Sequence, residues 1–489
     1  MHPSRAVSRV AESIDEVDRF ATELDAWFAS APGLLGRHGT QLSTLSEVLR
    51  PALLRNREHL AGLDTGRDAG EVYDACRRAD RRTVFVRRLW QWFATRFDQR
   101  RDPRTRDVLQ AADEVVWSCW APAWQLTGAG RPGPAPLPYL DPQISASTTP
   151  RQDVPHDLAA VRDSELAAQV RAMPVPVIAL PERVAWRPWW LVLLAHETGH
   201  HVQFELTPDA GAAAGDVVAD AAARAGAGDD EVLGWQRWSA EMFADAYAAV
   251  LTGPAITWAV GELELRAGDG VLRSPAPGYP PPLVRLALLA AITGEPAVVG
   301  DPASTGDPGG AGRGPAGSGP LAARVTGLLE RVPAVAAALL TVPVGSATLA
   351  VAAPQAVAWR QAAAVWRRQL TATAEPRPSA TVDAARLCVA GAVAAWRDTS
   401  AGIAADRHGS GATAGTRGTG ARTSTRTAAG TGAGGASDGD RLSRRLLTVL
   451  PACGPSGLRS TTAAPAAAVR RAARSVSDAL FSAAVEEEP

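Results

Sequence analysis

Apolar residues recur at spacings of three and four over most of the chain, which predicts a mainly helical protein. In residues 1–127 the clearest run is Val17, Phe20, Leu24 and Trp27, and two similar runs follow it. We therefore expect an N-terminal helical region over 1–127. No glycine-rich phosphate-binding loop occurs within it.

Shifts in composition divide the rest of the chain into further segments. The predicted segments are a Pro/Gly-rich linker or loop at 128–155, a core at 156–299, a Gly/Pro loop at 300–320, an Ala-rich helical region at 321–398, a low-complexity disordered linker at 399–440 and a C-terminal helical tail at 441–489.

The predicted core contains one strand signal and two strong helix signals. The apolar run at 175–181 predicts a strand, and Pro176 within it favours an edge position, because proline cannot donate a hydrogen bond to a neighbouring strand. A helix is expected at 188–206 and a second one at 230–252. The second begins with an acidic cluster, which favours a helix N-terminus.

The first of these helices carries two histidines, His196 and His200, separated by four residues. Residues at that spacing lie on the same face of a helix, so both imidazoles can bind one metal ion. Glu197 follows the first ligand and projects beside the metal, where it can take a proton from metal-bound water. His201 lies one step off this face, and we expect it to pack against or support the site.

A catalytic zinc ion needs a third protein ligand, and the second helix offers Glu241. Asp245 lies four residues later on the same face and can hold a histidine ring through its second nitrogen, as a supporting residue rather than a ligand. Ala244 and Ala248 on that stripe are small enough to let the two helices approach closely. We therefore predict Zn²⁺ bound by His196, His200 and Glu241.

The sequence HETGH, followed by Glu241 and Asp245 in an E-x-x-A-D pattern, resembles the gluzincin metallopeptidases over residues 175–292. It is most similar to their Ste24/HtpX-like branch. The resemblance implies a zincin-like metallopeptidase domain with a short edge strand or small sheet, flanked by helical regions. It also implies that substrate binds along the strand at 175–181.

This branch often has a His-Pro segment with an arginine six residues after the histidine. Here Tyr279 stands in place of that histidine, and Arg285 matches the arginine. The resemblance implies catalytic roles for both, facing the oxyanion that develops on the substrate. A phenol can donate the same hydrogen bond as an imidazole. The membrane-spanning helices of the branch are not evident, which implies a soluble relative.

Composition restricts the partners of the protein. Its 489 residues carry a formal net charge of -1, and all basic residues are arginine, so no global charge favours nucleic acid. The four cysteines are widely spaced, which favours free thiols in a reducing cytoplasm. The first 30 residues predict an amphipathic helix without the apolar core that is typical of a signal peptide, and the uncharged stretch at 332–359 favours buried helices over a membrane span.

These observations predict a soluble zinc endopeptidase that acts on peptide or protein substrates, with protein partners possible through the flanking helical regions. Two alternatives stay open at this stage. One is a zincin-fold module that regulates or binds partners without hydrolysis, and intact Glu197 argues against it. The other is a zinc amidohydrolase acting on a small molecule, which would differ from a peptidase in the width of its cleft.

Overall fold

The computed structural model describes residues 3–30, 32–66, 68–127, 135–142, 147–149, 164–264, 268–295, 320–351, 356–409, 437–454 and 466–482. This part of the chain is mainly helical, with one three-stranded and one two-stranded sheet. The expected Gly/Pro loop up to residue 319 and residues 410–436 of the expected low-complexity linker lie outside the described residues.

The elements of the N-terminal half, in which η marks short 3-10 or π segments, are α1 Pro3–Ala29, α2 Pro32–Ala61, α3 Ala69–Asp98, α4 Pro103–Leu126, β1 Leu137–Asp141, β2 Ser147–Thr149, α6 Ser164–Ala172, β3 Val177–Pro181, η1 Glu182–Ala185, η2 Pro188–Leu193, α7 Leu194–His201, η3 Val202–Leu206 and α8 Asp209–Arg224. The elements that follow are α9 Asp229–Arg237, α10 Ser239–Thr252, α11 Pro254–Glu264, η4 Gly268–Leu272, α12 Pro282–Thr293, α13 Pro320–Leu339, β4 Pro343–Val344, β5 Ala347–Thr348, η5 Leu349–Val351, α14 Ala356–Thr371, α15 Ala384–Gly409, α16 Asp438–Val449, η6 Leu450–Ala452 and α17 Ala466–Ser482.

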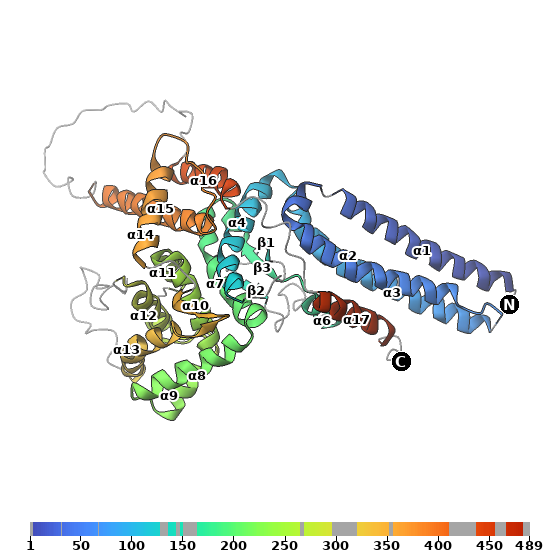
Figure 1. Cartoon of the computed structure of the whole chain (residues 1–489), viewed down its shortest axis with the longest axis horizontal. Coiled ribbons are helices and arrows are strands. Elements are labelled where there is room, and N and C mark those ends of the chain that lie inside the picture. Colours follow the sequence, from blue (N-terminus) through green and yellow to red (C-terminus); the bar gives the residue numbers. More distant parts are fainter. Residues whose placement is uncertain are drawn as a thin grey trace, which may run out of the picture.

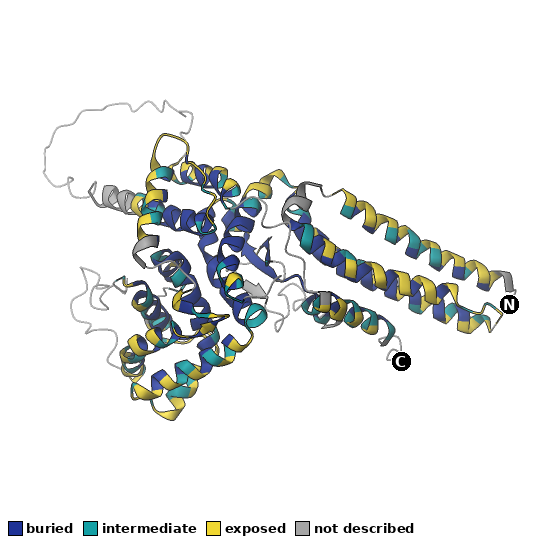
Figure 2. Cartoon of the chain, in the orientation of Figure 1, coloured by how far each residue is buried: buried dark blue, intermediate teal, exposed yellow. Residues whose placement is uncertain are grey.

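Helices α1, α2 and α3 form a long bundle that projects from the rest of the molecule, with α17 alongside it (Figure 1). Their apolar stripes meet in one core that includes Phe20, Leu24, Leu49 and Phe93. The outer faces of these helices are exposed (Figure 2), as the spacing of three and four predicts. The C-terminal helix α17 thus returns to pack on the N-terminal bundle.

The main body gathers α4, α7, α8 and α10–α16 around a second core. Helix α7, which carries the two histidines, is buried within this body, in contact with α4 on one side and α10 on the other (Figures 1 and 2). The body therefore extends beyond the predicted core at 156–299. It also contains α4, from the expected N-terminal region, and α13–α16, from later segments.

The three-stranded sheet lies between the two cores, in the order β1-β3-β2. In β3, Val177 and Ala179 belong to the bundle core, whereas Ile178 and Leu180 belong to the main core. Alternate side chains of a strand point to opposite faces, so both faces of β3 are buried. This explains why the strand is a continuous apolar run with no polar alternation.

The predicted edge position of this strand is wrong. β3 pairs in parallel with β1 and antiparallel with β2, so it is the central strand. Pro176 lies just before β3, so its lack of an N–H group removes no hydrogen bond from the strand itself. Its carbonyl accepts a hydrogen bond from the N–H of Leu137 at 2.8 Å. Within the described residues, β1 pairs with the whole of β3 and β2 pairs with Val177–Ala179, so most of this strand already has partners on both sides.

The segment at 128–155 was expected to be a linker or loop, but it supplies β1 and β2, two strands of the sheet. Their short length and Pro-rich flanks conceal them in the sequence. The segment expected to be disordered from residue 399 is likewise helical at its start, because α15 continues to Gly409.

A buried polar cluster joins the bundle to the sheet. Asp113 of α4 lies 3.0 Å from Nε2 of His38 and accepts two hydrogen bonds from the guanidinium of Arg100, at 2.6 and 3.1 Å. Arg100 also donates to the carbonyl of Pro138 in β1 at 2.8 Å. Burial raises the pKa of the Asp113 carboxyl, but Arg100 and His38 outweigh burial and hold it well below its usual range.

Among the described helices, none contains an uncharged apolar stretch of the length that a bilayer crossing requires. The four cysteines are all free and buried, as their spacing predicts.

Candidate metal centre

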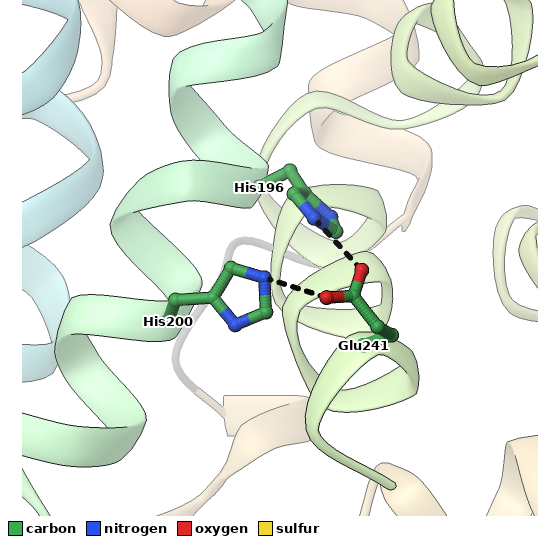
Figure 3. A group of neighbouring side chains, drawn as sticks. All are labelled: His196, His200 and Glu241. Carbon is green, nitrogen blue, oxygen red and sulfur yellow. Dashed lines mark ion pairs between the residues drawn. The ribbon is translucent and has the colours of Figure 1, made fainter. Parts of the chain in front are cut away.

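Three metal-ligating side chains converge between α7 and α10, and all three are buried (Figure 3). Nε2 of His196 lies 3.5 Å from Oε2 of Glu241, and Nε2 of His200 lies 3.4 Å from its Oε1. Two ligands held at about 2.1 Å from a tetrahedral metal ion are separated by roughly 3.4 Å. The spacing and the donor set therefore fit a single metal ion, and the three residues form a group that could hold one.

The helical segment predicted at 188–206 runs over those residues, but it changes type twice. It begins as the 3-10 segment η2 at Pro188, continues as the α-helix α7 and ends as the π-helical turn η3. The α-helical part contains both histidines, so their spacing of four places them one turn apart. Leu191, Val192 and Leu194 fix this segment in the main core.

The second predicted helix, at 230–252, is two helices. The chain turns at Trp238, between α9 and α10, and Glu241 lies in the first turn of α10. The break turns α10 away from α9, so α10 alone carries Glu241 and Asp245 against α7.

Gly199 allows the two site helices to approach this closely. A Cβ atom at this position would lie 3.0 Å from Cα of Ala244 and 3.2 Å from Cβ of Tyr247. These separations are shorter than ordinary contacts between carbon atoms. The predicted close approach through Ala244 is therefore correct, and it depends equally on a glycine in α7.

Asp245 occupies the predicted supporting position. Its Oδ1 lies 2.8 Å from Nδ1 of His196, on the side of the ring opposite Glu241. A carboxylate at Nδ1 orients the imidazole and leaves Nε2 to face the metal position. Asp245 is fully buried and does not belong to the group of three possible ligands.

Arg285 joins this network from α12, but its orientation differs from the expected one. Its Nε and Nη2 donate to the two oxygens of Asp245 at 2.6 and 2.9 Å, and its Nη1 donates to Glu264 at 3.1 Å. Its Nη2 also lies 3.8 Å from Glu241. Every nitrogen of the guanidinium therefore faces a carboxylate, and the residue is placed to hold Asp245 rather than to face a substrate.

Tyr279 lies near the metal group, as its place in the sequence motif led us to expect. Its phenol lies near enough to Glu241 and Glu197 for both carboxylates to influence its pKa, while about a third of the residue remains exposed, at 38%. Burial, followed by the negative charges of Glu241 and Glu197, raises the pKa of this phenol. Tyr279 therefore keeps its proton at neutral pH and remains a hydrogen-bond donor.

Glu197 is buried in α7 directly after the first histidine. Its charge is near enough to Tyr279 to contribute to the raised pKa of that phenol. A carboxylate and a phenol thus lie in the neighbourhood of the three possible ligands.

His201 supports the site helix, as expected from its place off the ligand face. Its Nε2 lies 3.1 Å from the carbonyl of Val177 in β3, and its Nδ1 lies 3.1 Å from Glu205 in the π-helical turn. The imidazole therefore links the end of α7 to the central strand of the sheet.

The charges of the group favour a bound cation. Burial alone lowers the pKa of the His196 imidazole, but Asp245, helped by Glu241, outweighs burial and raises it to about 10. Burial works against ionisation of Glu241 too, yet the two histidines hold its pKa well below the usual range. In the absence of metal, His196 is therefore protonated, and a metal ion must displace that proton.

Two residues of the site were not anticipated. Glu264 holds Arg285 from α11, and no motif links residues 21 positions apart on two helices. The second is Gly199, which the HExGH pattern contains but whose packing role appears only when α10 is in place.

Comparisons of the chain with protein-family models, with curated proteins and with solved structures found no match. The chemistry of the site therefore has to be argued from the residues themselves.

Proposed function

We propose that the protein is a zinc-dependent hydrolase that cleaves peptide bonds. The observation that carries this proposal is the grouping of one ligand atom each from His196, His200 and Glu241 within 4.8 Å of one another, with Glu197 directly after His196 in α7. Two imidazoles and one carboxylate leave a fourth position open, which is the arrangement of catalytic zinc sites.

Zinc is the metal that this donor set suits best. Zn²⁺ binds neutral imidazole nitrogens and carboxylate oxygens in tetrahedral geometry, whereas Mg²⁺ and Ca²⁺ prefer sites made only of oxygen ligands. The burial of all three ligands also favours an ion that needs few water molecules around it. When bound, zinc would lower the pKa of a water molecule and polarise a carbonyl group.

The chain's own residues would then perform the proton transfers. The carboxylate of Glu197 takes a proton from the attacking water and delivers it to the departing amine nitrogen. The hydroxyl of Tyr279 donates a hydrogen bond to the carbonyl oxygen as negative charge develops on it. Asp245 holds His196 in the tautomer whose Nε2 faces the metal position, and Arg285, held by Glu264, fixes Asp245.

The same residues support a relationship with the gluzincins. Under this proposal the main body is a zincin-like domain, and the nearest branch is the Ste24/HtpX-like one. The E-x-x-A-D pattern is supported by the contacts of Asp245 with His196 and of Ala244 with Gly199. Arg285 departs from the role first expected, because it supports Asp245 instead of facing an oxyanion.

A pair of measurements on one substitution tests the proposal. Glu197→Gln keeps the shape of the side chain and removes its basicity, so the variant should bind zinc like wild type. Hydrolysis of a mixed peptide library, followed by mass spectrometry, should fall by about 10²–10⁴-fold, the contribution of a positioned base.

Two outcomes would overturn the proposal. In one, the zinc-loaded wild type cleaves peptides and the Glu197→Gln variant cleaves them equally well. In the other, the zinc-loaded wild type cleaves no peptide in the library, and a panel of small amides then separates an amidohydrolase from a protein that does not hydrolyse amide bonds.

A further inference from the structure

A groove of about 550 Å³ lies at the surface between α9, the segment after η4 and the start of α13. Three arginines line it, one from each of these parts: Arg237, Arg273 and Arg324. All three are exposed. One carboxylate, that of Asp230, also lines the groove, which leaves an excess of two positive charges.

Composition alone does not explain this cluster, although every basic residue of the chain is arginine. Exposed arginines elsewhere are commonly paired with acids, as Arg50 is with Asp25 at 2.6 Å. Within the described residues, the three groove arginines form no ion pair or hydrogen bond through their side chains. By contrast, Arg331, further along α13, lies 2.8 Å from Glu231 of α9, and this ion pair links the two helices that form walls of the groove.

Two residues that line the groove lie close along the chain to residues of the metal centre. Trp238 lines it and stands three residues before Glu241, which is about 5 Å along a helix. Pro277 lines it and stands two residues before Tyr279, at most about 7 Å of extended chain. A turn closed by the N–H of Tyr279 and the carbonyl of Ala276, at 3.0 Å, joins the groove wall to Tyr279.

We propose that this groove binds an acidic segment of the substrate polypeptide and places the neighbouring peptide bond at the metal centre. This inference rests on the proposed function and adds a substrate class to it. Guanidinium groups on three sides suit carboxylates, which they can bind through paired hydrogen bonds. Trp238 and Pro277 link the groove along the chain to Glu241 and Tyr279, so we expect an extended peptide to place the acidic residues roughly two to four positions from the cleaved bond.

A binding assay on the full chain tests this inference separately from catalysis. The protein carries Glu197→Gln, so that bound peptide is not consumed, and the probes are fluorescent dodecapeptides that differ only in Glu-to-Gln replacements at four central positions. Fluorescence polarisation at low ionic strength should show tighter binding of the Glu peptide, and the difference should shrink as salt is added.

Charge reversal in the groove supplies the decisive comparison. The double variant Arg273→Glu and Arg324→Glu should weaken binding of the Glu peptide by roughly tenfold or more, because each attraction becomes a repulsion. Binding of the Gln peptide should change little. The matched control is Arg444→Glu on the exposed face of α16, which should leave both affinities unchanged, and thermal melts should confirm that all variants fold.

The inference is overturned if the double variant binds the Glu peptide as tightly as the Arg444→Glu control does. It is also overturned if a single-stranded oligonucleotide of equal charge binds as tightly and with the same dependence on Arg273 and Arg324, because the groove would then be a site for phosphate polyanions.

Failure of the groove and failure of the proposed function remain distinguishable. If Glu peptides bind through the arginines but the zinc-loaded wild type cleaves no peptide, the groove stands and the hydrolase proposal falls. If the wild type cleaves neutral and acidic peptides at equal rates, and the arginines do not affect binding, the hydrolase stands and the groove inference falls.

Discussion

Replacement of Gly199 by alanine should damage the metal centre through the packing of two helices. The new Cβ would lie 3.0 Å from Cα of Ala244 and 3.3 Å from its carbonyl oxygen, both backbone atoms that cannot rotate away. Carbon atoms ordinarily approach one another to about 3.5–4.0 Å. Helices α7 and α10 must therefore separate by roughly 0.5–1 Å, and Glu241 moves with α10.

Two opposing terms decide the effect on stability. Alanine in place of glycine within a helix gains about 1 kcal/mol, whereas overpacking of a core costs about 1–3 kcal/mol. We expect the free energy of unfolding of the metal-free protein to fall by between 0 and about 2 kcal/mol. Zinc ligands tolerate deviations of only about 0.2 Å, so the effect on metal affinity should be larger, on the order of 10–100-fold.

Two other glycines serve as controls in urea unfolding and in competition with a chromophoric zinc chelator. Gly261→Ala in α11 places a Cβ 3.8 Å from Leu286, an ordinary contact, so stability and affinity should be unchanged or slightly higher. Gly391→Ala in α15 places a Cβ 2.6 Å from Cβ of Trp366, away from the metal group, so it should destabilise the protein but leave the zinc affinity of the folded protein intact.

The reasoning is refuted if Gly199→Ala binds zinc as tightly as wild type does. It is refuted equally if Gly199→Ala and Gly391→Ala weaken zinc binding to the same degree, because the loss would then reflect general destabilisation and not the spacing of α7 and α10.

Three further predictions concern single side chains. Asp245→Asn should weaken zinc affinity by roughly 10–100-fold without abolishing binding, and chelator competition showing wild-type affinity would contradict the support of His196. Tyr279→Phe should lower kcat by about 10–1000-fold and leave zinc content unchanged, whereas wild-type turnover would exclude the phenol from catalysis. Because Arg100 and His38 hold the pKa of Asp113 below its unfolded value, the stabilisation from this carboxylate is present above about pH 4 and is lost as pH falls. Between pH 6 and pH 3, urea unfolding should therefore show a smaller loss of stability for Asp113→Asn than for wild type, and equal losses would contradict the assignment.

Much of the site could be predicted from sequence because its information is local. His196 and His200 are four residues apart, and so are Glu241 and Asp245. In an α-helix this spacing places the two members of each pair on the same face. The ends of the first site helix, at Pro188 and before Thr207, were readable for the same reason. Only the change from 3-10 to α to π geometry within it has no sequence signal.

The sheet could not be predicted because its strands are short and buried on both faces. The continuous apolar run of β3 shows no alternation, and proline just before it indicated an edge strand. β1 and β2 lie in a Pro-rich stretch that is typical of loops. Their pairing with β3 depends on contacts with both cores, which no local pattern reveals.

Arg285 illustrates a limit of the resemblance itself. The motif correctly brought the arginine to the metal group, but its partner Glu264 comes from α11, outside the motif. With Asp245 and Glu264 both present, the guanidinium is held among carboxylates. Its orientation therefore follows from the whole set of charges, which the spacing of six residues from Tyr279 does not encode.

The central claim is that His196, His200 and Glu241 bind one zinc ion, and native mass spectrometry of the purified chain tests it most directly. We predict one zinc ion per chain for wild type and for Glu197→Gln, and none for His200→Ala under the same conditions, with the His200→Ala variant still folded by circular dichroism. Full retention of zinc by folded His200→Ala, or absence of zinc from wild type supplied with the metal, would contradict the account.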